Sequence, residues 1–255
     1  MKITFLGTGT SMGVPVIACR CDVCHSDDPH DHRFRTSALI ETDAGRNILI
    51  DIGPDFRMQM LAHHVQHLDA ILITHAHRDH VGGIDDIRAF NYVQESKMQI
   101  YGNAIALNAI RHDYHYIFEP HPYAGLPEAD LHIENGDHSF QAAGETVIPI
   151  RAMHKDLPVL GYRIGPIVYI TDANHIDNEE LDKAKGCQIM VINALRQTRH
   201  FSHFSLPEAL EIISRVNPQQ AYLTHISHEM GFHEAVGHSL PENVQLAFDG
   251  LAVTI

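Results

Sequence analysis

The sequence feature that most constrains this chain is a group of histidine and aspartate residues directly after an apolar run. Residues 71–74 read Ile-Leu-Ile-Thr and lead into His75, His77, Asp79 and His80, followed by a glycine pair. A short apolar run that ends in turn residues predicts a buried strand. Because side chains two residues apart on a strand point to the same side, His75 and His77 can bind one metal ion, while the following turn directs Asp79 and His80 toward another. The spacing predicts a two-metal site.

Other short β-rich runs, each with glycine or aspartate near its ends, recur along the whole chain. The expected strands are 2–6, 36–41, 47–51, 70–74, 98–101, 146–152, 162–164, 167–171, 189–193, 221–224 and a final pair within 244–255. The expected helices are 55–63, 85–91, 103–116, 178–184 and 206–216. Strands outnumber helices, and hairpin-like strand pairs are expected to outnumber strand-helix-strand crossovers. The pattern predicts an α/β protein with two sheets between outer helices, an αββα sandwich.

Length and charge narrow the possible classes. The 255 residues fit one domain over 1–255, and the formal net charge of -14 argues against a basic face that binds extended nucleic acid. The amino terminus lacks a basic segment followed by a sustained apolar run, and no stretch approaches the roughly 18 apolar residues of a membrane span. These features predict a cytoplasmic protein that does not bind membranes. The oligomeric state stays open, a homodimer included.

The chain has four cysteines, and three of them lie within six positions, at Cys19, Cys21 and Cys24. In a chain without an export signal, such a cluster indicates metal binding more readily than a disulfide framework. A closed tetrahedral zinc site needs a fourth ligand, for which His228 and His25 are the candidates. Adjacency to Cys24 directs the ring of His25 away from a shared ion, which favours His228. Cys187 lies alone in an apolar run and receives no role.

The His-x-His-x-Asp-His group after an apolar strand resembles the hallmark of the metallo-β-lactamase superfamily. The resemblance implies three further ligands, each after a strand, and His154, Asp172 and His225 stand at such positions. By analogy, His75, His77 and His154 bind one ion, Asp79, His80 and His225 bind the other, and Asp172 bridges them. The resemblance also implies that Asp51, at the end of an earlier strand, orients the ligand loop. A turn-forming role for Asp51 is the alternative.

Two further pieces are similar to a narrower family, the phosphoribosyl cyclic phosphate phosphodiesterases of the carbon-phosphorus lyase pathway. These pieces are Cys-x-Cys-x-x-Cys at 19–24 and Thr-His-x-x-His at 224–228. The resemblance implies that Cys19, Cys21, Cys24 and His228 jointly bind a structural zinc. It also implies that a histidine just before the helix 206–216 protonates the leaving oxygen. His203 best matches that position, with His200 as the alternate; an imidazole suits proton transfer at cellular pH.

The predicted function is hydrolysis of a small phosphodiester, and the resemblance suggests a cyclic ribose phosphate. The resemblance implies two divalent ions, Mn²⁺ or Zn²⁺, that supply a hydroxide, while three thiolates select zinc more clearly. Asp79, His203 and His200 are therefore the predicted catalytic residues. Three arginines could steady the phosphate or form surface ion pairs: Arg78, Arg196 and Arg199.

Three other functions compete with this prediction. A nuclease that processes RNA 3′ ends shares the motifs, but the acidic charge and the lack of a long basic insertion count against it. A thioester or lactam hydrolase would need neither the cysteine site nor the proton donor. A non-catalytic carrier on the same fold is the alternative from another class. Residues 111–130, polar and aromatic with three prolines, are predicted to be either a lid over the active site or a surface loop.

Overall fold

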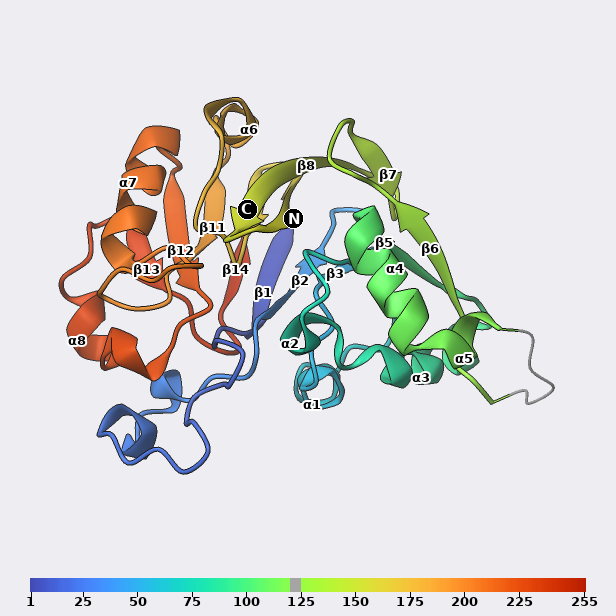
Figure 1. The fold of residues 1–255 in the computed structure, drawn as a ribbon, viewed down its shortest axis with the longest axis horizontal. Coiled ribbons are helices and arrows are strands. Elements are labelled where there is room, and N and C mark those ends of the chain that lie inside the picture. The colour runs from blue at the N-terminus through green and yellow to red at the C-terminus, as the bar shows by residue number, and fades with distance from the viewer. Residues whose placement is uncertain (120–124) are drawn as a thin grey trace.

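Two seven-stranded β-sheets packed face to face form the centre of the structure, a computed structural model that describes residues 1–119 and 125–255 (Figure 1). The first sheet runs in the order β14 (Ala252–Thr254), β1 (Lys2–Gly7), β2 (Ser37–Glu41), β3 (Asn47–Ile50), β4 (Ala70–Leu72), β5 (Met98–Gly102) and β6 (Ala129–Ile133). The second runs in the order β13 (Val244–Leu246), β12 (Gln220–Thr224), β11 (Ile189–Asn193), β10 (Ile167–Ile170), β9 (Leu157–Ile164), β8 (Glu145–His154) and β7 (Phe140–Ala142).

The helices lie on the two outer faces of this pair of sheets. Those beside the first sheet are α1 (Phe56–Ala62), α2 (Arg78–Val81), α3 (Arg88–Gln94), α4 (Ala104–Asp113) and α5 (His115–Phe118). Those beside the second are α6 (Asn178–Asp182), α7 (Leu206–Val216) and α8 (His233–Gly237). Four 3₁₀ turns lie at Val23–His25, Pro29–Asp31, Ile84–Ile87 and His228–Met230. The predicted αββα sandwich of the α/β class is confirmed.

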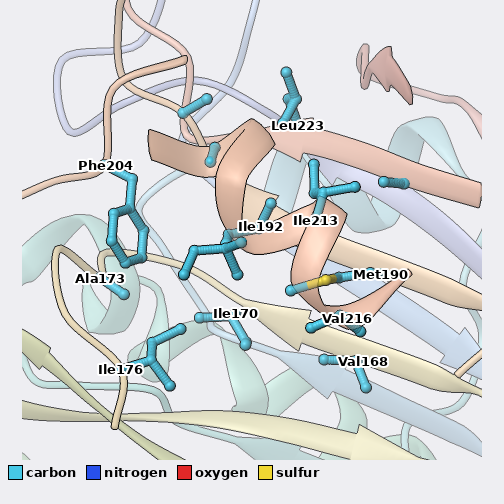
Figure 2. Close-up of a cluster of buried hydrophobic side chains, with 14 of the residues drawn as sticks. Val168, Ile170, Ala173, Ile176, Met190, Ile192, Phe204, Ile213, Val216 and Leu223 are labelled. Atoms are coloured by element: carbon cyan, nitrogen blue, oxygen red, sulfur yellow. The ribbon is translucent and has the colours of Figure 1, made fainter. Parts of the chain in front are cut away.

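Three hydrophobic cores separate the four layers, because alternate residues of a buried strand face opposite sides of its sheet. On β3, Ile48 and Ile50 pack between the sheets while Leu49 packs under the helices of the first half. On β10, Tyr169 faces the space between the sheets and Val168 faces the helices of the second half. Figure 2 shows this last core, with α7 laid over the side chains of β10, β11 and β12. Continuous apolar runs therefore mark strands that are covered on both faces.

The strand pairings differ from the prediction in one respect. Each sheet has three antiparallel and three parallel pairings, so hairpins do not outnumber crossovers. One parallel pairing that was not predicted joins β5 to β6, a short edge strand in which apolar and polar residues alternate and which has no fully buried side chain. The expected final pair within 244–255 exists as β13 and β14, but these strands belong to different sheets.

The segment 103–133 also departs from expectation. The helix predicted over 103–116 is divided at Tyr114, whose φ of -111° and ψ of 37° are not helical, into α4 and α5. Residues 111–130, predicted as a lid or a surface loop, contain the end of α4, all of α5 and the start of β6, and residues 120–124 lie outside the described part of the chain. Among the described residues, no helix combines the length and the apolar character needed to span a membrane.

Candidate metal centre

The predicted ligands follow strands that all end at one edge of the sandwich. In the first sheet, β3 and β4 are parallel. In the second sheet, β11 is parallel to both β10 and β12, so these three strands share one direction. β8 has that direction too, because β9 lies between β8 and β10 and is antiparallel to both. Carboxyl ends of strands with one direction lie at one edge of a sheet. His75 follows β4, Asp172 follows β10, His225 follows β12, and His154 is the last residue of β8.

Three residues at these strand ends have a backbone conformation that the sequence pattern did not reveal. Asp51, Asp172 and His225 have φ of 60°, 54° and 56°. Residues other than glycine seldom occupy this left-handed region, and such strain is held only where the surrounding structure enforces it, often at functional sites. Each of these side chains is buried and joins the cluster described below.

The first group of candidate ligands is His75, His77 and His154, whose ligand atoms lie within 4.8 Å of one another. His75 Nε2 lies 3.0 Å from His77 Nδ1. The Nδ1 of His154 donates to the carbonyl oxygen of Ser202 over 2.8 Å, which leaves Nε2 with a free lone pair. Three imidazoles with ligand atoms this close together form the kind of donor set that binds zinc or manganese.

The second group is Asp79, His80, Asp172 and His225, also within 4.8 Å of one another. Asp172 Oδ2 lies 3.2 Å from His80 Nε2 and 3.1 Å from His225 Nδ1. Both nitrogens are buried and neither makes a hydrogen bond among the described residues. A buried polar atom without a partner is costly, so two of them facing one carboxylate fit a cation between them. A carboxylate oxygen of Asp172 also lies within 4.8 Å of a ring nitrogen of His154, which places Asp172 between the two groups.

The protonation states of the candidate ligands also suit metal binding. Burial lowers the pKa of His75 well below that of free imidazole and lowers the pKa of His225 to about 3, so both rings are neutral. Burial raises the pKa of Asp172, but the imidazoles of His225 and His80 outweigh this effect and bring the pKa well below its usual range. Neutral imidazole and ionised carboxylate are the forms that bind metals.

His80 differs from its neighbours. Burial lowers its pKa, but the carboxylates of Asp172, Asp51 and Asp79 outweigh burial and raise the pKa well above that of free imidazole. The carboxylates therefore hold a positive charge at this position. A divalent cation in the second group would take the place of that proton, so the residues present fit a metal ion.

Asp51 lies behind the ligands and is fully buried. Its Oδ2 accepts from His80 Nδ1 over 2.7 Å and from the hydroxyl of Thr74 over 2.8 Å, and its Oδ1 accepts from the backbone N–H of Thr74 over 2.8 Å. These contacts direct the Nε2 of His80 toward the cluster and tie the start of the ligand loop to β3. Gly53 lets the backbone pass close to the ligand loop, because a Cβ there would lie 2.2 Å from the carbonyl oxygen of Asp79.

The two candidate proton donors occupy different places. His203 Nε2 lies 3.1 Å from Asp172 Oδ1, and its ligand atom groups with those of His154 and Asp172. His200 stands one ring farther out, with its Nδ1 3.3 Å from His203 Nδ1. Ser202, which sequence reasoning missed, contacts both rings through its hydroxyl and His154 through its carbonyl oxygen. Its position in His-Phe-Ser-His, between the two candidate proton donors, was the sequence feature that could have indicated this role.

The four predicted residues of the cysteine site also come together, within 4.8 Å of one another. His228 Nδ1 lies 3.4 Å from Cys19 Sγ and 3.2 Å from Cys21 Sγ. Burial raises the pKa of the Cys24 thiol to about 11, so this thiol ionises only when a cation replaces its proton. The competing His25 is exposed, and its ring contacts the carbonyl oxygen of Cys21.

The arginines considered for phosphate binding already have partners. Arg78 lies 3.1 Å from the hydroxyl of Tyr114, and Arg196 forms an ion pair with Glu229 over 2.7 Å. Arg199 is the most exposed of the three and lies 3.6 Å from Glu208. For Arg78 and Arg196 the structure thus shows surface ion pairing or hydrogen bonding, and among the described residues the side chain of Arg199 contacts only Glu208.

The chain is similar to known proteins in sequence and in structure. Residues 46–226 match the family model for the beta-lactamase superfamily domain. An octanoyltransferase of Porphyromonas gingivalis is 43% identical over 100% of this chain, but the match covers 52% of that protein. The chain therefore spans about half the length of this relative, whose name does not tell which half carries its activity.

Solved structures extend the comparison. A diphosphatase from the PhnP family superposes with a TM-score of 0.92 at 35% identity, covering 100% of this chain and 97% of that one. Zinc-bound PqqB from Methylobacterium extorquens covers 100% of both chains with a TM-score of 0.81 and 17% identity, which shows a shared fold. The chain belongs to the metallo-β-lactamase superfamily and, within it, to the PhnP family.

Proposed function

We propose that this protein hydrolyses a small phosphodiester at a site of two divalent cations. The observation that carries the proposal is the position of Asp172 between two groups of ligand atoms, with His203 on its far oxygen. His75, His77 and His154 would hold one ion and Asp79, His80 and His225 the other, with Asp172 shared. Ions bound there would supply a hydroxide at neutral pH and offset the charge of an anionic phosphate. Mn²⁺ and Zn²⁺ both suit these donors.

The protein's own residues would divide the remaining work. Asp51 keeps the ring of His80 in one orientation, and Ser202 does the same for His154. His203 stands beside Asp172 and is only slightly exposed, where it can give a proton to the departing oxygen. The contact with Ser202 limits the rotation of its ring. His200 would act through His203, as a positioning residue.

A structural zinc held by Cys19, Cys21, Cys24 and His228 completes the proposal. Its ligands join the loop near the amino terminus to the turn after β12, three residues beyond His225. Zinc at this point would hold that turn, and with it one ligand of the catalytic ions, in place. A small substrate rather than extended nucleic acid, a cytoplasmic location and a single domain over 1–255 belong to the same proposal.

A substrate panel tests the function. The metals are removed with a chelator, Mn²⁺ or Zn²⁺ is restored, and turnover is measured on a bis-aryl phosphate, a ribose cyclic phosphate, a diphosphate, a precursor tRNA and a thioester. The diphosphate is included because a PhnP-family structure bears the name diphosphatase. We expect turnover of the small phosphodiesters. Exclusive cleavage of tRNA or thioester would replace the proposal with that activity, and failure on every substrate with both ion groups filled would favour a carrier.

If His203 donates a proton to the leaving oxygen, the loss of kcat in His203→Ala should depend on how basic the leaving group is. His203→Ala should lower kcat for a ribose cyclic phosphate, which expels a basic alkoxide, by about 10²- to 10⁴-fold. The effect on bis(4-nitrophenyl) phosphate should be far smaller, because nitrophenolate departs without a proton. His200→Ala should have a smaller effect on the same ratio. An equal fall for both esters in His203→Ala would remove His203 as the proton donor.

The role of Asp51 predicts a change in metal affinity. Asp51→Asn weakens the acceptor for His80 Nδ1, and loss of such an outer partner typically lowers metal affinity by about 10- to 100-fold. Competition with a chelating dye measures this. Asp137→Asn, on an exposed loop, is the matched control and should bind metal as the wild type does. Unchanged affinity in Asp51→Asn would limit Asp51 to the turn-forming role.

A further inference from the structure

A second group of donor atoms lies on the side of His203 that faces away from the catalytic cluster. The Nε2 of His203 is directed at Asp172 Oδ1, so its Nδ1 points the other way, toward His200. The Nδ1 atoms of the two rings lie 3.3 Å apart. The hydroxyl oxygen of Ser202 lies 3.0 Å from Nδ1 of His203 and 3.3 Å from Nδ1 of His200. Two imidazole nitrogens and one hydroxyl oxygen thus form a small triangle of donors.

The sides of this triangle match the spacing of ligands around a tetrahedral zinc ion. Zinc–nitrogen bonds of about 2.0–2.1 Å at tetrahedral angles place two ligand nitrogens about 3.3–3.4 Å apart. The ring centroids of His200 and His203 are 5.2 Å apart, farther than the two nitrogens, so each ring extends outward from the shared space. His75 Nε2 and His77 Nδ1, which we assign to one catalytic ion, have a similar separation of 3.0 Å. An ion between His200 and His203 would replace the proton that the two rings share.

The surroundings of the triangle give an ion access and select its kind. His200 borders a surface hollow of about 460 Å³, from which an ion can enter and water can complete its coordination. Imidazole nitrogen suits Zn²⁺ and Cu²⁺, whereas Mn²⁺ prefers the oxygens of carboxylates and water. The three donors of the triangle include two imidazoles and no carboxylate. They therefore favour zinc over manganese more strongly than the mixed histidine and aspartate ligands of the catalytic cluster do.

We propose that an additional zinc ion binds Nδ1 of His200, Nδ1 of His203 and the hydroxyl of Ser202, and that it blocks proton donation by His203. In the proposed reaction Nε2 gives its proton to the leaving oxygen, and the ring stays neutral because Nδ1 keeps a proton. With zinc on Nδ1, loss of the Nε2 proton would leave an imidazolate anion, a far less favourable product. The inhibition rests on the proposed phosphodiesterase function, whereas the binding of the ion does not.

Binding of the additional ion can be measured without turnover. The zinc-loaded protein is dialysed against increasing concentrations of buffered free Zn²⁺, and the bound zinc is counted per chain. The wild type should take up one more ion than His200→Ala. His112→Ala removes a histidine on α4 whose side chain is 88% exposed; it is the matched control and should bind as much zinc as the wild type. Equal zinc counts in the wild type and His200→Ala would overturn the proposal.

Turnover supplies the second measurement. Over the zinc range in which the additional ion binds, kcat for a ribose cyclic phosphate should fall by about 10²- to 10⁴-fold, the effect expected from loss of a proton donor. Turnover of bis(4-nitrophenyl) phosphate should change far less, because nitrophenolate departs without a proton. His200→Ala, compared with its own rate at low zinc, should resist this inhibition, and added Mn²⁺ should not reproduce it.

The two measurements separate failure of the ion site from failure of the proposed function. Equal inhibition of both esters by zinc, or full inhibition in His200→Ala, would overturn the proposal even though the phosphodiesterase stands. An additional ion that depends on His200, in a protein that hydrolyses neither ester, would leave the ion site and remove the proposed function.

Discussion

Asp172→Ala is expected to reduce phosphodiester turnover by at least about a thousand-fold, the largest effect of any single substitution in this protein. The carboxylate contacts His80, His203 and His225, and it lies between both groups of candidate ligands. Its removal would take a shared ligand from both proposed ions and would leave His225 Nδ1 without its neighbouring carboxylate, while His80 Nε2 keeps Asp79 Oδ2 at 3.2 Å. Elemental analysis should therefore find fewer than two active-site ions per chain, together with the loss of turnover on bis(4-nitrophenyl) phosphate.

Two companion variants separate loss of the site from loss of the fold. Asp172→Asn preserves the shape of the side chain and removes its charge, so it should also lose activity while it unfolds near the wild-type temperature. Asp182→Ala changes an exposed aspartate that pairs with Lys185, and it should keep both the ions and the activity. A folded Asp172→Ala protein that retains a tenth of the wild-type rate would rule out a shared ligand at this position.

Cys24→Ser is expected to cost the protein one zinc ion and much of its stability. Cys24 is the buried member of the thiolate group, and zinc bound there links residues 19–24 to the turn that contains His228. Because metal binding at a structural site is coupled to folding, a loss of about 3 kcal/mol or more is reasonable, equivalent to roughly 6–12 °C in the midpoint of thermal unfolding. Circular dichroism during heating and zinc analysis of the same samples measure both effects.

The remaining cysteine and the two candidate histidines give sharp controls for this experiment. Cys187→Ala removes a buried thiol outside the cluster and should keep all the zinc. His228→Ala should lose the same ion as Cys24→Ser, whereas His25→Ala should lose none, because the His25 ring is exposed and turned to a backbone carbonyl. Zinc retained in His228→Ala and lost in His25→Ala would reverse the assignment of the fourth ligand.

The strands that carry the site could be predicted because their signal is local. The run 71–74 ends where polar ligands begin, and the runs 167–171 and 221–224 end the same way. Apolar side chains over a few consecutive residues are enough to indicate a strand buried on both faces. The edge strand β6 lacks that signal, since its side chains are only partly buried, and only pairing with β5 reveals it.

Other parts of the site depend on contacts between distant segments. The Ser202 carbonyl that orients His154 lies 48 residues away along the chain, and the oxygen of Asp51 that orients His80 lies 29 residues away. No periodicity encodes such contacts. The resemblance favoured His203 over His200, but the geometry behind that preference appears only in the folded chain, which places one ring beside Asp172 and the other behind it.

The sequence by itself indicated which side chains gather at the two candidate metal sites and which runs form the buried strands, because both depend on the type and spacing of neighbouring residues. Only the tertiary structure decided that β13 and β14 join different sheets and that Asp51, Asp172 and His225 adopt left-handed backbone conformations. These features arise when two sheets pack together and bring their strand ends to one edge. The free energy of that packing, rather than any local preference, holds the ligands in reach of one another.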